Sequence, residues 1–319
     1  GFAPRFNQPW QAAFDPDNPV PDNAVYLADR NNHAIRFTNA LTVSTVAGVM
    51  GSDGYTDGTG TSARFDNPQG FAISKRRIAL IGDSGNTRLR QMRLSDQSVS
   101  TLAGGNGPMI LDGFGTSARF RSIVGIAFVS DGVSAFLAEA QNYVRRVHVP
   151  TAHVLTVIGT GNAAWASDED PREAEVREVS GVCISEKTRT LFIVGPHAIS
   201  SMPLETVTPS RSRPTPSLSR APSTTVTSPP TRTRSRVALP ALVPVSPRAR
   251  QRVTFFIGST FAGDVNGPPP TARINDPQSC TATLDGERLF VSQGGDVVRN
   301  IDVGTDSATD VFVGSLGNP

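Results

Sequence analysis

Cysteine, histidine and large aromatic side chains are scarce in this chain of 319 residues, which has two Cys, four His, two Trp and three Tyr. Two cysteines cannot build the multi-disulfide framework of a small secreted domain or a four-thiolate metal site. The chain lacks an N-x-S/T sequon, so any attached sugar would be O-linked. It also lacks a run of about 18 apolar residues, and we therefore expect no membrane span.

Acidic residues are missing from one stretch, residues 206–250, which holds eight Arg and no Asp or Glu. The net charge of the whole chain is +2, so the remainder carries +2 − 8, or about −6. A mildly acidic body thus carries one basic segment. This segment, which we call the Arg/Pro insert, also contains nine Pro and sixteen Ser or Thr. Such a composition favours polyproline II or disorder over a packed core.

A hexamer, "GTSARF", occurs at residues 60–65 and again at 115–120, inside a longer repeated frame. The glycine that closes "STVAG" is a convenient marker of this frame. It recurs at Gly48, Gly104 and Gly159, with weaker copies at Gly258 and Gly314. The intervals are 56, 55, 99 and 56 residues, and the long interval exceeds the period by nearly the length of the Arg/Pro insert. The sequence therefore contains five copies of one repeat.

Each repeat contains four short segments rich in apolar or β-branched residues. In the second copy they span residues 70–74, 77–82, 88–94 and 98–104, and Gly, Asn, Asp and Ser separate them. No 11-residue window sustains a helical period. Four antiparallel strands every ~50 residues are typical of one blade of a β-propeller.

We therefore predict an all-β fold, a single β-propeller with five blades of four antiparallel strands. The blades fall at roughly 10–48, 70–104, 123–159, 180–258 and 280–314. Residues 1–205 would hold three blades and the start of the fourth, residues 206–250 an extended Pro/Ser/Thr/Arg-rich insert, and residues 251–319 the rest. A six-bladed propeller is the alternative, with one blade trimmed from a chain that begins at Gly1 without Met.

Three segments resemble the NHL repeat: "YLADRNNHAIRF" (26–37), "LIGDSGNTRLRQM" (80–92) and "FLAEAQNYVRRV" (136–147). The "DGxGTSARFxxPxG" loops are similar to those of NHL proteins of protists and algae. The resemblance covers nearly the whole chain outside the insert and is weakest in the last two copies. The fourth copy departs most, because "FIVGPHAIS" lacks the Asp-x-x-Asn core and Glu175 stands at the recurring Arg position.

Arginine recurs at one loop position of the repeat, at Arg5, Arg64, Arg119 and Arg273. We predict that these residues are structural and that each pairs with a repeat carboxylate such as Asp57 or Asp112 in bidentate geometry. The alternative is a basic ring that binds anionic ligands.

Acidic residues end the second strands, and each is followed by Asn three residues later. The pairs are Asp29 with Asn32, Asp83 with Asn86, and Glu139 with Asn142. We predict turns in which the carboxylate accepts backbone N–H groups. Metal binding is the weaker hypothesis, because the residues recur in each blade and do not converge on the axis.

The family resemblance also raises the question of catalysis. An amidating lyase with NHL-type repeats and gluconolactonase-type propellers hold a metal ion near the propeller axis. The pairs expected to line the axis here contain no His, Asp or Glu: Trp10-Gln11, Gly70-Phe71, Val124-Gly125, Gly181-Val182 and Ser279-Cys280. His33, His148, His153 and His197 are expected to be surface or packing residues. We therefore predict no enzyme and no catalytic, cofactor or metal site.

The two cysteines, Cys183 and Cys280, fall on the innermost strands of neighbouring blades but one residue out of phase in the repeat. Successive side chains on a strand point to opposite faces, so we expect the two to point differently. This predicts two buried thiols rather than a disulfide.

We therefore expect a structural or protein-interaction module, a glycosylated subunit of an extracellular fibre, cell-surface or flagellar-hair assembly. Its partners would be other protein subunits and O-linked glycans. The candidate glycosylation residues are Thr208, Ser210, Thr215, Ser217, Ser223, Thr224, Thr225, Thr227, Ser228 and Thr231. The alternatives are an intracellular NHL scaffold that binds RNA or protein, with the Arg-Ser stretch pairing with phosphate, and a metal-dependent lyase or lactonase. The acidic body and few aromatics disfavour nucleic acid.

Overall fold

The chain divides into one unit of residues 1–204 with 251–319 and a second of residues 205–250. The computed structural model describes residues 5–15, 25–39, 42–105, 107–160, 176, 178–204, 254–258, 276–283, 286–293, 297–303 and 309–313. The Arg/Pro insert with its candidate glycosylation residues, Glu175, Arg273 and both chain ends lie outside the described residues.

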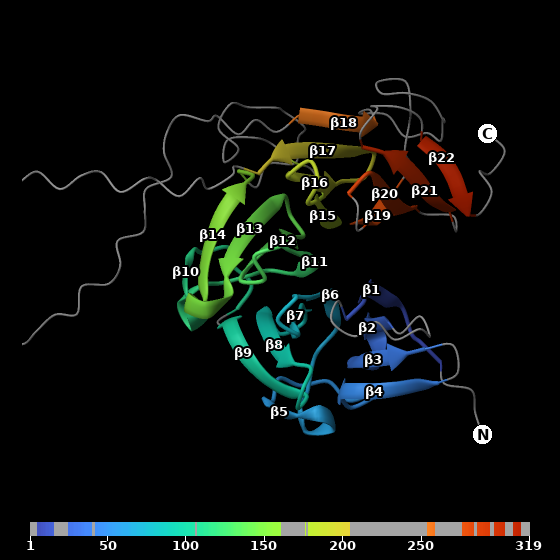
Figure 1. Cartoon of the computed structure of the whole chain (residues 1–319). Helices are drawn as coiled ribbons and strands as arrows, with labels where there is room; N and C mark the ends of the chain where they lie inside the picture. Colours follow the sequence, from blue (N-terminus) through green and yellow to red (C-terminus); the bar gives the residue numbers. More distant parts are fainter. Residues whose placement is uncertain are drawn as a thin grey trace, which may run out of the picture. The chain divides into compact units, whose positions relative to one another are not determined.

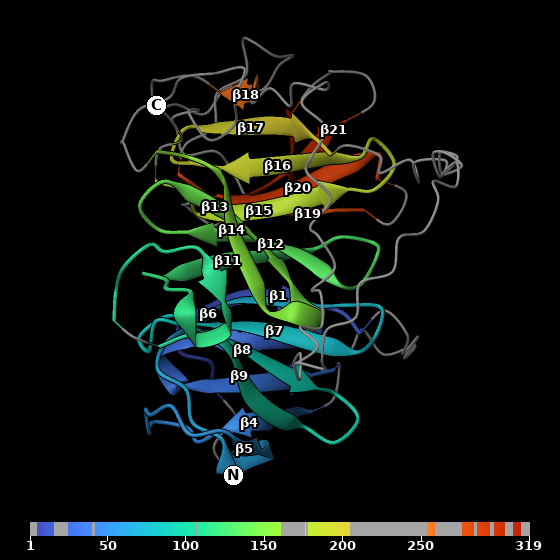
Figure 2. The same ribbon diagram turned by 90° about the vertical axis from the view of Figure 1, so that its left-hand side faces the viewer.

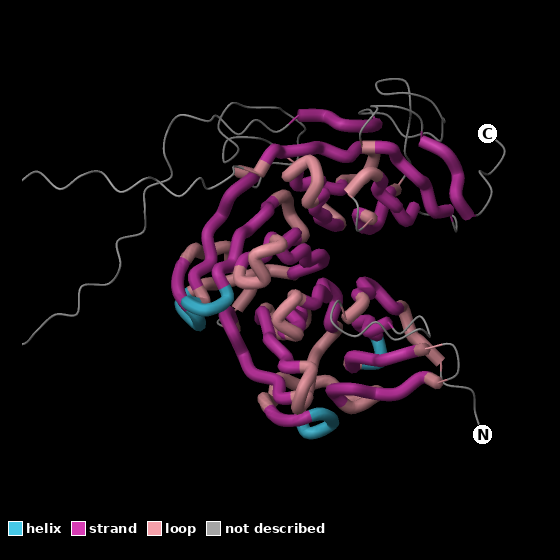
Figure 3. Tube along the Cα trace, in the orientation of Figure 1, coloured by secondary structure: helices cyan, strands magenta, loops and turns pink. Residues whose placement is uncertain are grey.

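The described residues form five antiparallel sheets, which we number as blades 1 to 5 in chain order (Figures 1 and 3). Blade 1 contains β1 (Pro9–Ala13), β2 (Val25–Asp29), β3 (Ala34–Thr38) and β4 (Val43–Gly48). Blade 2 contains β6 (Pro68–Ile73), β7 (Ile78–Asp83), β8 (Arg88–Arg93) and β9 (Ser98–Gly104). Blade 3 contains β11 (Ile123–Phe128), β12 (Ser134–Glu139), β13 (Tyr143–His148) and β14 (His153–Ile158).

Blade 4 contains β15 (Gly181–Ser185), β16 (Thr190–Val194), β17 (Ala198–Pro203) and β18 (Thr254–Gly258). Blade 5 contains β19 (Pro277–Ala282), β20 (Arg288–Gln293), β21 (Val297–Asp302) and β22 (Thr309–Val313). The helices in the described part are single 3₁₀ turns: η1 (Arg30–Asn32), η2 (Gly60–Ser62), η3 (Gly115–Ser117) and η4 (Val149–Thr151). The all-β, five-bladed propeller predicted from the repeat is confirmed. The blades follow one another in chain order, from blue through green and yellow to red (Figure 1), and Figure 2 shows the same sheets turned by 90°.

Two blades carry a short fifth strand that the sequence pattern did not predict. Strand β5 (Gly58–Thr59) pairs with β9, and β10 (Gly113–Phe114) pairs with β14. Both precede a "GTS" 3₁₀ turn. The inter-blade loop therefore first pairs with the outer strand of the blade that it leads into, and then continues to the inner strand of that blade. Part of each outer edge is thereby hydrogen-bonded, and a paired edge is a poorer template for association.

Alternating side chains give each blade two faces. We call the face toward the preceding blade in the chain the back face, and the opposite one the forward face. Four buried clusters join consecutive blades in this way. Between blades 2 and 3, for example, Ala72, Leu80 and Leu89 of the forward face meet Ile126 and Leu137 of the back face. Burial of apolar faces at about 25 cal/mol per Å² is the main term that holds the blades together.

Glycine on the inner strands lets neighbouring blades approach closely. A Cβ at Gly125 would lie 3.0 Å from the Cα of Gly181, and a Cβ at Gly181 would lie 3.1 Å from the Cα of Ser279. The recurring glycine of the innermost strand therefore reflects a contact between backbones and not a ligand site.

Candidate functional site: the loop face of the blades

The loop face is the side of the blades that carries the inter-blade loops and the turns between second and third strands. In blade 2 the fully buried Asp83 ends β7 on this side. Its Oδ1 accepts the backbone N–H of Asp66 at 2.7 Å, and the amide of Asn86 donates to both carboxylate oxygens at 2.9 and 3.0 Å. The prediction that this carboxylate accepts a backbone N–H group is confirmed.

The same contact recurs in the two flanking blades. Asp29 accepts the backbone N–H of Asn7 at 2.7 Å, and Glu139 accepts that of Arg121 at 3.0 Å. In each case the donor belongs to the loop that leads into the blade's own inner strand. The carboxylate therefore fixes the incoming inter-blade loop as well as its own turn.

The partner of these carboxylates is an arginine of the third strand. In blade 2 the fully buried Arg90 contacts Asp83 at 2.8 Å and Asp57 at 2.6 Å. Arg90 also donates to the carbonyls of Thr56 and Arg64, both at 3.0 Å. Its guanidinium lies 5.3 Å from the ring centroid of Phe65, the last residue of the repeated hexamer. A single arginine thus joins the turn, the inter-blade loop and the aromatic wedge between two blades.

Blade 3 repeats this network closely. Arg145 contacts Glu139 at 2.9 Å and Asp112 at 2.8 Å, and it lies 5.6 Å from the ring of Phe120. In blade 1 Arg36 contacts Asp29 at 3.1 Å. In blade 5 Arg299 is fully buried, whereas blade 4 has the buried Ser200 at this register position. The departure of the fourth repeat from the sequence frame is therefore the replacement of an ion pair by a small polar side chain.

The predicted pairing of the loop arginines with Asp57 and Asp112 is wrong. The guanidinium of Arg64 donates to the carbonyls of Thr61 and Ala63 at 2.9 and 3.3 Å. Arg119 lies 3.2 Å from the sulfur of Met109, and Arg5 is exposed. The backbone carbonyls of Arg64 and Arg119, in contrast, accept from the buried arginines. The loop position thus contributes through its main chain.

The arginines that do pair were missed because they sit in the middle of apolar strands. Arg36 and Arg90 follow their acidic partners by seven residues, and Arg145 follows by six. A charged residue in the third strand of each of these repeats was the available signal, since a buried arginine requires a carboxylate partner.

Burial dominates the electrostatics of the inner carboxylates. It raises the pKa of Asp83 to about 6 and that of Glu139 to about 7, against the opposing hydrogen bonds and the arginine charges. The outer carboxylate behaves differently. Burial also opposes the ionisation of Asp57, but hydrogen bonds from Thr101 and Arg90 outweigh it and hold its pKa below the usual value. Asp83 and Glu139 therefore titrate closer to neutral pH than Asp57 does.

Side chains of the first inner strand occupy the centre of the propeller. The indole of Trp10 donates to the carbonyl of Val124 at 2.8 Å, and the amide of Gln11 donates to the carbonyl of Ile126 at 2.9 Å. The Oε1 atom of Gln11 accepts the backbone N–H groups of Phe71 and Ile126 at 2.8 and 3.0 Å. Strand β1 is therefore hydrogen-bonded through side chains to the inner strands of blades 2 and 3.

The four histidines have different surroundings. His33 accepts the N–H of Asn67 at 3.2 Å, and His148 shares a hydrogen bond of 2.8 Å with Thr151. His153 stacks on the exposed Phe114 with centroids 4.1 Å apart. The buried Nδ1 of His197 has no hydrogen-bond partner within the described part. Across the described ranges no three His, Cys, Asp or Glu side chains gather in a metal-binding group.

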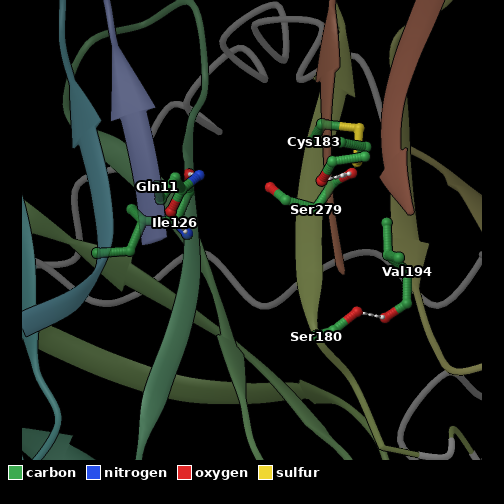
Figure 4. The surroundings of a disulfide bond; sticks show 8 residues. Gln11, Ile126, Ser180, Cys183, Val194 and Ser279 are labelled. Atoms are coloured by element: carbon green, nitrogen blue, oxygen red, sulfur yellow. Dashed lines mark hydrogen bonds between the residues drawn. A yellow bond between two sulfur atoms is a disulfide. The ribbon is translucent and has the colours of Figure 1, made fainter. Parts of the chain in front are cut away.

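The cysteines form a disulfide between blades 4 and 5, with Cα atoms 5.7 Å apart (Figure 4). The prediction of two separate thiols is wrong, because it compared the two strands as if they belonged to the same face of one sheet. Neighbouring blades meet with opposite faces, so side chains one residue out of phase are the ones that point toward each other. Cys183 lies on the forward face of β15 and Cys280 on the back face of β19, within one buried cluster. Ser180 also links the two blades by donating to the carbonyl of Pro277 at 2.8 Å. Figure 4 shows its second contact, with the carbonyl of Val194 at 3.3 Å.

Large exposed side chains occur in two of the inter-blade loops. Tyr55 is 62% exposed, and the guanidinium of Arg88 lies 4.3 Å from its ring centroid. Met50, Met109 and Leu111, in corresponding loops, are each about half exposed. Three of them contact arginines: Tyr55 lies beside Arg88, Met50 beside Arg36 and Met109 beside Arg119.

These features define the chain as a β-propeller, and the resemblance to NHL-repeat proteins inferred from the sequence is confirmed. The chain is 26% identical over 230 residues to NHL repeat-containing protein 2 of Bos taurus, an alignment that covers 63% of this chain and 32% of the relative. It is 27% identical over 208 residues to the chloroplastic protein SUPPRESSOR OF QUENCHING 1 of Arabidopsis thaliana, with 60% of this chain and 19% of the relative covered. The chain thus spans about a third or less of these relatives. No family model matches it.

Solved structures support the fold. A chain of a nidogen/laminin complex matches with a TM-score of 0.55 at 12% identity, covering 95% of this chain and 79% of the other. An auxiliary nutrient binding protein from Bacteroides thetaiotaomicron matches with a TM-score of 0.52 at 14% identity, covering 96% and 69%. A propeller of this kind is compatible with a protein-interaction module. Within the described residues, no helix has the length and apolar character needed to cross a membrane.

Proposed function

We propose that this chain is a non-enzymatic docking module of an extracellular or cell-surface assembly, with other protein subunits as its partners. The disulfide between Cys183 and Cys280 carries the proposal. Disulfides persist in oxidising compartments and are rare where glutathione keeps thiols reduced. The covalent link between blades 4 and 5 therefore favours the outside of the cell.

The use of the charged residues supports a non-enzymatic role. Asp29, Asp83 and Glu139 are each held by an arginine and a backbone N–H group of the incoming loop. Such groups maintain loop geometry and are not free to exchange protons with a substrate. The side chains of Trp10 and Gln11 are likewise engaged by backbone groups at the centre of the propeller.

The finer proposal concerns the Arg/Pro insert, residues 206–250. Its nine Pro and sixteen Ser or Thr suit an extended segment that carries O-linked sugar. In a fibre or flagellar-hair subunit, rigid blades would present docking surfaces, and the insert would lie along a neighbouring subunit. The insert carries eight arginines and the rest of the chain is mildly acidic, so the insert of one subunit and the propeller of another have complementary charge.

The test is peptide mapping of the native protein, extracted with an alkylating agent and without reductant. We expect one linked peptide pair that contains Cys183 and Cys280, and glycopeptides across residues 206–250. Alkylation of both thiols in the native protein would overturn the extracellular location. A linked pair with a bare insert would keep the location and remove the glycosylated-fibre role.

A second candidate is an NHL scaffold that binds RNA or protein. The pairing of the exposed Tyr55 with Arg88 favours it, because an aromatic ring beside a guanidinium can stack with a nucleotide base. Binding of a fluorescent single-stranded RNA that is weakened by Tyr55→Ala would support this function. A metal-dependent lyase or lactonase ranks third, and metal analysis of the native protein tests it.

A further inference from the structure

Turns between second and third strands are hydrogen-bonded to the loop that leads into the next blade. In blade 3 the Oδ1 atom of Asn142 accepts the backbone N–H of Glu178 at 2.6 Å. In blade 4 the carbonyl of Pro196 accepts the N–H of Asp276 at 2.9 Å. Glu178 and Asp276 occupy one position of the repeat and have left-handed φ values of +44° and +48°. These hydrogen bonds therefore hold a loop residue in a conformation that is unfavourable without glycine.

In blade 1 the acceptor of this hydrogen bond is a histidine. His33 lies directly before β3, as Asn142 lies directly before β13, and both have positive φ. Its Nδ1 accepts the backbone N–H of Asn67 at 3.2 Å, and Asn67, with φ of +49°, occupies the repeat position of Glu178. An amide oxygen remains an acceptor as the pH changes, whereas an imidazole nitrogen that binds a proton becomes a donor. Blade 1 thus uses a titratable group where blade 3 uses an amide.

A carboxylate lies beside the same imidazole nitrogen. The Oδ1 atom of Asp66 is 3.5 Å from Nδ1 of His33 and accepts the side-chain amide of Asn67 at 2.7 Å. While His33 is neutral, 3.5 Å is longer than a normal hydrogen bond. A proton on Nδ1 would be attracted to this carboxylate and would oppose the Asn67 N–H, which is itself a donor. Protonation therefore favours contact with Asp66 and removes the acceptor from Asn67.

The other charged groups around His33 already have partners. Asp29 on the same turn and Asp83 on the turn of blade 2 are each held by the arginine of their third strand. Arg30 of η1 lies over an indole ring, and Arg64 of the incoming loop donates to backbone carbonyls. The carboxylate described above is thus the ion-pair partner of His33 within the described ranges. The His33 side chain is 19% exposed, so protons from the solvent can reach it.

The hydrogen bond from Asn67 also affects the loop of residues 49–67, which leads from β4 to β6. The N–H of Arg64 donates to the carbonyl of Thr56 at 2.9 Å, so the segment around the exposed Tyr55 is tied to the segment that ends at Asn67. A positive φ at a non-glycine residue persists only where surrounding contacts hold it. Loss of the acceptor would therefore allow Asn67 to leave this conformation and the loop to move.

We propose that His33 is an acid-sensitive switch between blades 1 and 2. In its neutral form Nδ1 holds the N–H of Asn67 and fixes the loop that carries Tyr55. In its protonated form His33 pairs with Asp66 and releases that loop. The switch is independent of the extracellular location proposed above.

The test is the exchange of single backbone amide protons, measured by NMR on the full chain between pH 8 and pH 5, the range in which imidazoles titrate. Division by the intrinsic rate at each pH gives a protection factor. We expect the protection of the Asn67 amide to fall about threefold to tenfold as the pH is lowered, the size expected for one hydrogen bond. The Glu178 amide is the matched internal control, because its acceptor is an amide oxygen, and its protection should stay constant. An Asn67 amide whose protection does not change with pH would overturn the proposal.

The variant His33→Asn places the acceptor of blade 3 in blade 1. We expect it to keep the Asn67 amide protected and to remove the pH dependence. Asp83, whose pKa is about 6, titrates in the same range and accepts the N–H of Asp66, but it is unchanged in this variant. A pH dependence that persists in His33→Asn would therefore assign the effect to Asp83 and overturn the proposal.

A second variant, Asp66→Asn, removes the charge that the protonated imidazole pairs with. We expect the fall in Asn67 protection to move to lower pH, because protonated His33 loses its partner. A fall that stays at the wild-type pH would show that His33 does not re-pair with Asp66 and would overturn the proposed switch.

Discussion

At the scale of single residues, the loop face is organised by charges that are paired inside the protein. Arg90 and Arg145 are fully buried, and each bridges an inner carboxylate, an outer carboxylate and loop carbonyls. Removal of one partner from a buried ion pair leaves an uncompensated charge, which is far costlier than loss of an exposed pair. The arginines therefore determine the conformation of the inter-blade loops.

Replacement of Arg90 by methionine keeps the length of the side chain and removes its charge. We expect the free energy of unfolding to fall by about 3–5 kcal/mol, because Asp83 is left buried without its cation. Arg93→Met on the same strand is the control, since Arg93 is exposed and its contact with Asp96 is 3.4 Å long; we expect a change within about 0.5 kcal/mol. Urea unfolding measures both, and equal losses would refute the structural role of Arg90.

The raised pKa of Glu139 predicts a pH dependence of stability. Its pKa is about 7 in the folded protein and about 4.3 in an unfolded chain, so the folded state binds the proton more tightly. The stability it contributes is thus greatest below pH 4.3 and declines as pH rises to 7, by at most about 1.4 kcal/mol per pH unit. Asp83, with a pKa of about 6, contributes a slope of the same sign.

Urea unfolding between pH 5 and pH 8 tests this slope. In Glu139→Gln we expect a shallower decline than in the wild type, because one of the two titrating carboxyl groups is gone. Asp96→Asn is the control: the pKa of the exposed Asp96 is lowered by Ser98, so its contribution changes only at more acidic pH. A wild-type stability that does not change between pH 5 and pH 7 would contradict the assignment.

At the scale of elements, the inter-blade loop acts as a wedge between two sheets. It pairs with its own outer strand through β5 or β10, turns through "GTS", and inserts Phe65 or Phe120 between blades. The glycine that ends the preceding outer strand receives this ring. Gly104 has φ of +86°, and a Cβ there would lie 2.6 Å from both the Phe120 ring and the carbonyl of Thr87. The glycine that marks the repeat, such as Gly104, and the phenylalanine that ends the repeated hexamer, such as Phe120, therefore form one contact.

Gly104→Ala tests this contact. We expect a loss of about 2–4 kcal/mol, from backbone strain at positive φ together with the clash against Phe120 and Thr87. Gly107→Ala is matched to it, because Gly107 also has positive φ (+92°) but open space around its Cβ position; strain alone costs about 1–2 kcal/mol. Thermal or urea unfolding of the two variants separates the terms. If both lose the same amount, the wedge contact is unimportant.

At the scale of the whole molecule, the disulfide ties together blades that the Arg/Pro insert separates in sequence. It closes a loop of 97 residues between Cys183 and Cys280, and that loop includes the whole insert. Long loops have the largest entropy in the unfolded chain, so a crosslink that spans one stabilises the fold most in the chain-entropy model. The bond therefore compensates for an excursion in the middle of blade 4.

The double variant Cys183→Ser/Cys280→Ser tests that effect. We expect the free energy of unfolding to fall by about 2–5 kcal/mol. Addition of dithiothreitol would lower wild-type stability toward that of the variant and leave the variant unchanged. A wild-type protein whose unfolding is insensitive to reductant would show that the crosslink adds nothing to the fold.

The sequence by itself determined the period, the number of blades in the chain and the position of most strands. These features depend on local chemistry: alternation of apolar residues and turn residues between them. In the second repeat the expected segment 98–104 matches β9, and 88–94 differs from β8 by one residue. The turn carboxylates, such as Asp83, were also predictable, because their role is set within one turn and its adjoining loop.

Only the tertiary structure decided which residues meet across blades. The pairing of Arg90 with Asp57 and the disulfide both depend on how one sheet lies on the next. The disulfide shows the physical reason most plainly. Strand alternation fixes which face of its sheet each of Cys183 and Cys280 occupies. Only the stacking of a forward face on a back face brings two cysteines that are one residue out of phase in the repeat into contact.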